Sequence, residues 1–157
     1  MVGGFRVIAN EREYASGSLQ NLFVGIWREE VTRGAVEGLY RGLRSLSREW
    51  PDGVGMCLYV EQETVVPAPE IRDFLIEQRR TVAAHLIAAS LAVEGEGLWS
   101  STVRTISVTL GLASGITYPS MSFGSIVEAA DWQRAQMGSD FTVSADVIVR
   151  AIASMRT

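Results

Sequence analysis

The sequence predicts an α/β protein with a mixed sheet of four to five strands, helices packed on that sheet and an extra helix at the C-terminal end. Strand-like segments alternate with segments of helical periodicity along most of the chain. The 157 residues are 47% hydrophobic and 20% charged, which is typical of a globular chain that buries roughly 70% of its unfolded surface. We therefore expect one α/β domain over residues 1–157.

The N-terminal part of the chain is expected to form a peripheral element and then a strand. Residues 1–20 are predicted to form an edge strand or an arm, because residues 5–14 mix apolar and charged side chains. Residues 15–18 read Ala-Ser-Gly-Ser, a composition typical of a turn. Residues 22–27 are rich in aromatic and branched side chains, and this composition predicts a strand.

The first helix is predicted to follow Thr32, whose side chain can cap it. Apolar residues then recur at three- and four-residue steps from Val36 to Trp50, where a Pro-Asp-Gly turn ends the helix. Three glycines share this helix at four-residue spacing, namely Gly34, Gly38 and Gly42. Each costs roughly 1 kcal/mol relative to alanine, so close packing is expected there. We favour internal contact between helix and sheet over a self-association face.

Two further strands are predicted to be buried, with a helix between them. Residues 54–60 are almost continuously apolar and are expected at the centre of the sheet. Pro69 suits the first position of the next helix. Residues 87–93 then form the second buried strand.

The last third of the chain continues this alternation. A helix is expected over residues 99–112, capped by Ser100 or Ser101 and ended by Gly115. Pro119 places the following strand at an edge of the sheet. Two more helices are expected at the C-terminal end. The first begins with a capping box at residues 125–128, and the second lies at residues 144–155, within a helical extension over residues 139–157.

Charge and cysteine content exclude several classes of function. The formal net charge of −4 argues against a nucleic-acid partner, which requires clustered positive charge. No run of about 18 apolar residues occurs, so membrane insertion is not expected. Cys57 is the single cysteine and no secretion signal is evident, which makes the cytoplasm the expected compartment.

The residues that could support catalysis are few. Cys57 lies in the most apolar run and is interpreted as a structural thiol. His85 lies near a helix end and is interpreted as a partly buried histidine or one stabilised by the helix dipole, rather than a general base. Residues 94–97 alternate glutamate and glycine, which suits a solvated turn, because the carboxylates have the wrong sign for a phosphate loop. No metal-ligand spacing occurs. We therefore assign no catalytic, cofactor-binding or metal-binding residue and expect no cofactor and no enzyme activity.

The tryptophans are the candidate interface residues. All four lie at the ends of predicted elements, where a large ring is half covered: Trp27, Trp50, Trp99 and Trp132. Most are expected to be edges of the core. One or two are expected to anchor a protein interface, because tryptophan is enriched among the residues that carry binding energy.

Three segments carry a resemblance to a known family. They are the strand at residues 54–60 with its proline-started helix, residues 91–93 with the glycine-rich turn and helix that follow, and residues 123–132 with their capped, alanine-rich helix and tryptophan. Over residues 22–136 this order resembles the STAS-like domains related to bacterial anti-sigma-factor antagonists. The resemblance implies a non-enzymatic regulatory or scaffolding domain that docks onto a partner protein.

The same resemblance implies a phosphorylation switch in the loop after the central strand. Thr64 is the hydroxyl residue of the corresponding stretch, residues 61–69, and is the candidate switch position. No glycine follows it, and the flanking Glu61 and Glu63 would repel a phosphate of about −1.5 to −2 charge. This departure from the family's pattern argues against the switch in this chain.

Two functional hypotheses follow from these observations. The first is a domain that acts by protein–protein interaction with an unidentified partner, with a homodimer as one form of that interaction. The alternative is a small-molecule or lipid-binding domain with an apolar pocket between helices and sheet. Its motivation is a surplus of apolar helix residues, namely Ile106, Leu110, Leu112 and Ile148.

Overall fold

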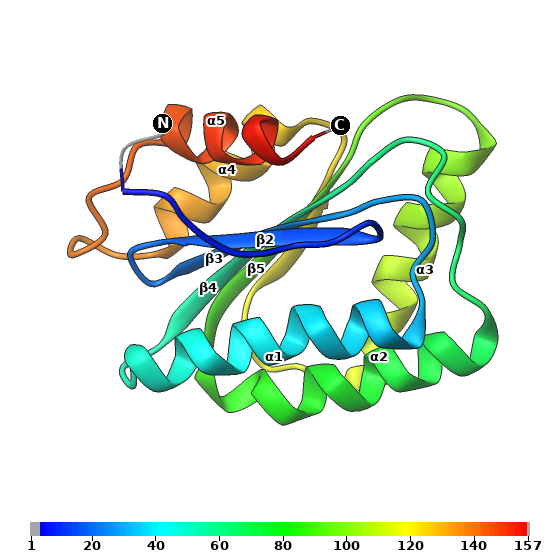
Figure 1. Cartoon of the computed structure of the whole chain (residues 1–157), viewed down its shortest axis with the longest axis horizontal. Helices are drawn as coiled ribbons and strands as arrows, with labels where there is room; N and C mark the ends of the chain where they lie inside the picture. Colours follow the sequence, from blue (N-terminus) through cyan, green and yellow to red (C-terminus); the bar gives the residue numbers. More distant parts are fainter. Residues whose placement is uncertain (1–3, 157) are drawn as a thin grey trace.

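The computed structural model describes residues 4–156 and shows one sheet covered by helices on both faces (Figure 1). The strands are β1 (Arg6–Asn10), β2 (Tyr14–Leu19), β3 (Leu22–Trp27), β4 (Val54–Val60), β5 (Leu86–Val93) and β6 (Ser120–Phe123). The helices are α1 (Arg33–Glu49), α2 (Pro69–Val82), the short 3-10 turn η1 (Ala83–His85), α3 (Leu98–Ser114), α4 (Ile126–Gln136) and α5 (Ala145–Met155). Within the described residues, no helix is long and apolar enough to cross a membrane.

The six strands lie in the order of the sequence, from β1 to β6. β2 is antiparallel to both of its neighbours, β1 and β3, whereas β3, β4, β5 and β6 run parallel. Crossovers between parallel strands are almost always right-handed. Three successive crossovers in one direction therefore place their helices α1, α2 and α3 on one face, and α4 and α5 cover the other (Figure 1).

The mixed α/β class, the central position of β4 and the edge position of β6 are confirmed. The predicted strand number was too low, because the sheet has six strands rather than four to five. Residues 15–18 were expected to form a turn, yet they lie inside β2, which is buried along its whole length. Their small side chains suit a strand that is covered on both faces, and Gly17 leaves room for the ring of Phe5.

The predicted helix ends are confirmed in most cases. The side chains of Thr32, Ser125 and Ser144 accept hydrogen bonds from the first turns of α1, α4 and α5. Gly115 ends α3 in the left-handed conformation, with φ of 61°. The predicted cap of α3 was wrong, because Gly97 is its N-cap and the Ser100 hydroxyl instead donates to the Gly97 carbonyl.

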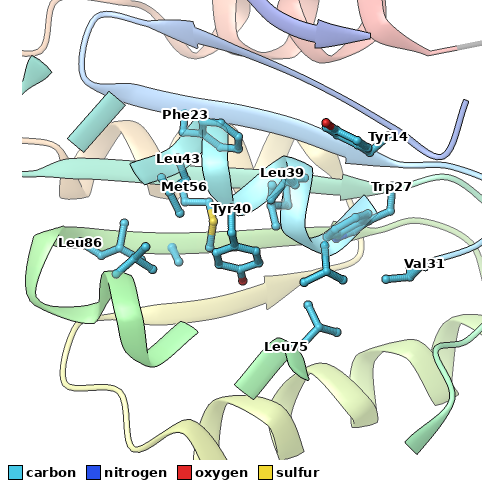
Figure 2. Close-up of a cluster of buried hydrophobic side chains, with 14 of the residues drawn as sticks. Tyr14, Phe23, Trp27, Val31, Leu39, Tyr40, Leu43, Met56, Leu75 and Leu86 are labelled. Atoms are coloured by element: carbon cyan, nitrogen blue, oxygen red, sulfur yellow. The ribbon is translucent and has the colours of Figure 1, made fainter. Parts of the chain in front are cut away.

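The face of the sheet under α1, α2 and α3 carries the larger core. Figure 2 shows Phe23, Leu43, Met56 and Tyr40 filling the space between α1 and the sheet, and all four side chains are buried. The apolar stripe predicted for α1 is confirmed except at its end, where Trp50 is 42% exposed just beyond the helix.

The second core lies under α4 and α5, where Ile148 and Ile152 are buried against β2 and β3. This observation confirms the extra C-terminal helix as part of the folded protein. Arg28, itself buried at the end of β3, donates hydrogen bonds to the carbonyl oxygens of Met155 and Glu11 and so holds the end of α5 against the sheet.

Candidate functional site

A cavity of about 70 Å³ lies between the sheet and the helices α1, α2 and α3. The loop at residues 61–68 forms one of its walls through Thr64, Val65 and Pro67. Its surface is mostly apolar and comes from strands and helices together, including Trp27, Val31, Leu58, Val60, Ile106 and Leu110.

Two of the four apolar helix residues that motivated the small-molecule hypothesis line this cavity, and two do not. Ile106 and Leu110 face it from α3. Leu112 belongs to the same helix but points away from the sheet and is 80% exposed. Ile148 is fully buried in the core on the opposite face of the sheet. Leu112 and Ile148 therefore add nothing to this cavity, because helical position alone does not reveal which face of the sheet a helix covers.

A smaller hollow of about 20 Å³ adjoins the cavity beneath α3. The two share the side chains of Leu58, Arg79, Leu91 and Ser107. The smaller one is rich in hydroxyl groups, which come from Ser107, Tyr118, Ser120 and Ser122. Ser90 also borders it, but the Ser90 hydroxyl points to the other face of the sheet and binds Gln133 of α4. The space under α3 thus has an apolar part and a polar part, and the guanidinium-bearing Arg79 lies between them.

Arg79 reaches this position from α2, and its Nη1 atom lies close to Gly111 of α3. Its Nε atom is buried and has no hydrogen-bond partner. Tyr118 is buried beside it, and burial raises the pKa of the Tyr118 phenol to about 12. At neutral pH the Tyr118 hydroxyl is therefore protonated and able to donate a hydrogen bond.

Thr64, the candidate switch residue, is buried. Its hydroxyl donates to the Glu61 carbonyl oxygen at 2.6 Å, and its own carbonyl accepts from Trp99 Nε1 at 2.9 Å. Thr64 therefore joins the loop to the first turn of α3. In this conformation the hydroxyl faces the protein and not the solvent.

The four tryptophans belong to four parts of the fold. Trp27 is buried, lines the cavity and lies against Tyr14 at a ring-centroid distance of 6.4 Å. Trp99 contacts the cavity's loop from α3 through its bond to Thr64. Trp132 packs on Phe123 under the opposite face, at 5.8 Å between ring centroids. The structure brings Trp27 and Trp99 near one loop and places Trp50 and Trp132 elsewhere.

Cys57 and His85 lie in different surroundings. Cys57 is fully buried in the second core, where desolvation raises the pKa of its thiol to about 11. His85 is exposed at the end of the 3-10 turn η1. No group of three or more His, Cys, Asp or Glu side chains that could hold a metal ion occurs within residues 4–156.

The Glu94 carboxylate makes hydrogen bonds that were not predicted from the sequence. It accepts hydrogen bonds from the Tyr59 hydroxyl at 2.9 Å and from the Ile126 backbone N–H at 3.2 Å. Arg156 lies 4.0 Å from the same carboxylate. The expected solvated turn is thus corrected at Glu94, which links the ends of β4 and β5 to the first turn of α4. The one feature of the sequence that could have indicated these contacts is an acidic residue immediately after a buried strand.

The outer side of α3 and the neighbouring strand β6 form an uncharged surface, which we call the α3–β6 surface. Residues 105–127 contain no Asp, Glu, Lys, Arg or His. Val108 and Leu112 of α3 are exposed beside a groove of about 330 Å³ that lies between α3 and β6. Met121 of β6 is also exposed, and its side chain leaves the same edge strand on the face away from α3. Sequence reasoning missed this surface, although the long uncharged run was a visible signal for it.

Comparisons with protein-family models, with curated proteins and with solved structures found no match to this chain.

Proposed function

We propose that the chain is a non-enzymatic regulatory or scaffolding domain that acts by protein–protein interaction, and that its α3–β6 surface binds a second copy of the chain. The observation that carries this proposal is the uncharged run of residues 105–127, which displays exposed apolar side chains at one edge of the sheet. The STAS-like resemblance, which also implies docking, remains a prediction and is part of the same proposal.

Charge favours this surface as the place where two copies meet. Each chain has a formal net charge of −4, so two copies repel each other, and this repulsion is smallest where the facing surfaces carry no like charge. The cores of protein interfaces are depleted of charged residues. The α3–β6 surface meets this condition, and its side chains Val108, Leu112 and Met121 are 58%, 80% and 51% exposed.

The geometry of β6 supports a symmetric pair. β6 is an edge strand that is hydrogen-bonded to β5 on one side. An edge strand offers its backbone N–H and C=O groups to another strand. Two copies of one strand can pair antiparallel about a two-fold axis, which is the commonest symmetry among homo-oligomers. Such pairing would place the exposed apolar side chains of α3 near the partner's groove.

The oligomeric state of purified protein tests the proposal. By size-exclusion chromatography with light scattering, the wild-type chain of 17.1 kDa is expected to show twice that mass. Leu112→Glu and Met121→Glu each place a charge in the interface, and we expect each to shift the equilibrium to monomer, with at least about a tenfold weaker association.

The matched control is Val7→Glu. Val7 is 60% exposed on β1, the strand at the opposite edge of the sheet, and the substitution makes the same change in charge. We expect Val7→Glu to remain dimeric. A wild-type chain that is monomeric at every concentration contradicts the proposal, as does a dimer that all three variants leave equally intact.

A further inference from the structure

We infer that the space beneath α3 is a binding site for a small carboxylate with a compact, branched apolar body. The site combines the apolar cavity of about 70 Å³ with the adjoining hydroxyl-rich hollow of about 20 Å³. Arg79 lines both parts and is the charged group between them. The inference does not rest on the proposed dimer, although Ser107, Tyr118, Ser120 and Ser122 of the hollow also line the groove of the α3–β6 surface.

The positive charge of Arg79 is the reason to expect a carboxylate in this site. Arg79 is half-buried: its Nε atom is covered and has no hydrogen-bond partner, and no ion pair of Arg79 occurs among the described residues. A buried donor that lacks a partner costs free energy, more so when its group is charged. A carboxylate satisfies a guanidinium with two parallel hydrogen bonds, which a neutral amide or an amine cannot provide.

The polar part of the site can complete the recognition of that carboxylate. Tyr118 is close enough to Arg79 for the two groups to interact electrostatically, and its hydroxyl is a donor at neutral pH. The hydroxyl groups of Ser107 and Ser122 lie 3.4 Å apart at the same hollow. The carboxylate group would therefore lie beneath α3, between Arg79 and these hydroxyl groups.

The apolar part sets the size of the ligand body. The cavity walls carry branched and aromatic side chains such as Val31, Val60 and Ile106, and the site places the ligand body against them. A protein cavity that binds benzene has a volume of about 150 Å³, which is roughly twice the volume found here. A body of about three to five carbons fits, whereas a long acyl chain does not. Of the small-molecule and lipid ligands that the second hypothesis allowed, the cavity volume therefore favours short ones.

Calorimetric titration of the full chain with 3-methylbutanoate tests the inference. We expect saturable binding with a one-to-one stoichiometry per chain, and roughly 10- to 100-fold weaker binding of 3-methylbutanamide, which has the same shape without the charge. Arg79→Met is expected to weaken 3-methylbutanoate binding by a similar factor. The matched control is Arg48→Met, because Arg48 is exposed in the last turn of α1 and lines neither hollow.

A second variant separates loss of the site from loss of the fold. Val103→Phe places a ring in the cavity and leaves the Arg79 side chain in the sequence, and it should abolish binding. Thermal unfolding of each variant identifies any that fails to fold, and backbone NMR shifts of the wild-type chain then locate the ligand. The inference is overturned if 3-methylbutanoate does not bind, if acid and amide bind equally, or if the shifts lie away from Arg79, Ser107 and Tyr118.

Discussion

Two glycines determine how closely α1 approaches the antiparallel edge of the sheet. A Cβ atom on Gly38 would collide with the ring and hydroxyl of Tyr14, and one on Gly42 would lie 3.1 Å from Ile8 Cγ2. Gly34 has no neighbouring atom within 4 Å of such a Cβ position. The interpretation of the glycine ridge as internal packing is therefore confirmed at Gly38 and Gly42.

Alanine substitutions at Gly38 and Gly34 should have opposite effects on stability. Gly34→Ala should stabilise the protein by roughly 0.5–1 kcal/mol, because alanine is the better helix former and the position is open. Gly38→Ala should destabilise it by about 1–3 kcal/mol, because the Tyr14 side chain must move. Urea unfolding measures both changes. Equal stabilisation by the two substitutions would show that the Tyr14 side chain can move aside without lowering the stability.

Contacts between residues close in sequence could be predicted, and distant ones could not. Thr32 caps α1 through a bond to Ala35, three residues away, and the side-chain type alone indicates it. The bonds of Trp99 to Thr64 and of Tyr59 to Glu94 each join residues 35 positions apart. Such pairs depend on which strands are neighbours and on the face each helix covers. Neither fact is encoded in a local pattern.

A buried polar contact holds α4 to the sheet. Gln133 is completely buried on α4, its Oε1 accepts a hydrogen bond from the Ser90 hydroxyl at 2.6 Å, and its Nε2 donates to the Ala88 carbonyl at 3.2 Å. Buried polar groups that lose such partners destabilise a protein more than the bond itself contributes. The contact therefore fixes the position of α4 along β5.

Removing Gln133 alone should cost more than removing it together with Ser90. Gln133→Leu leaves the Ser90 hydroxyl without its acceptor, and a loss of about 2–3 kcal/mol in unfolding free energy is expected. Adding Ser90→Ala should recover roughly 1 kcal/mol of this loss, because the orphaned hydroxyl is removed. Chemical denaturation of both single variants and the double variant measures the coupling. Strict additivity would contradict a direct interaction.

Element type was predictable where one residue pattern dominated a segment. The apolar run of β4 and the helical period of α1 both indicated their elements correctly. β2 was missed because residues 15–18 have a turn-like composition, and only their burial by neighbouring elements makes them a strand. For the space beneath α3, the sequence offered only a surplus of apolar helix residues. Its polar half could not be predicted, because the residues that form it come from separate strands, loops and helices.

At the scale of the whole molecule, helices on both faces bury ionisable groups in the sheet. Cys57 and Tyr59 are neighbours on β4, and Tyr118 precedes β6. Burial is the main cause that raises the pKa of Cys57 from 9.0 to about 11, and of Tyr59 and Tyr118 from 10.0 to about 12. The folded protein thus retains these protons at pH values where the unfolded chain loses them.

This difference predicts a loss of stability in alkaline solution. Below pH 9 the Cys57 thiol is protonated in both the folded and the unfolded chain, so the free energy of unfolding keeps its full value. As the pH rises from 9 toward about 11, the unfolded thiol ionises first, and stability should fall by about 1.4 kcal/mol per pH unit for this group. The tyrosines extend the fall above pH 10.

Thermal unfolding between pH 7 and pH 11 measures this loss in the wild-type chain and in Cys57→Ala. Alanine at this position leaves a small cavity and lowers stability at every pH, so the slopes are compared and not the absolute values. The slope between pH 9 and pH 10 should be smaller in Cys57→Ala, because there the wild-type fall comes mainly from the thiol. Identical slopes in the two proteins would show that the Cys57 thiol is not the group that titrates.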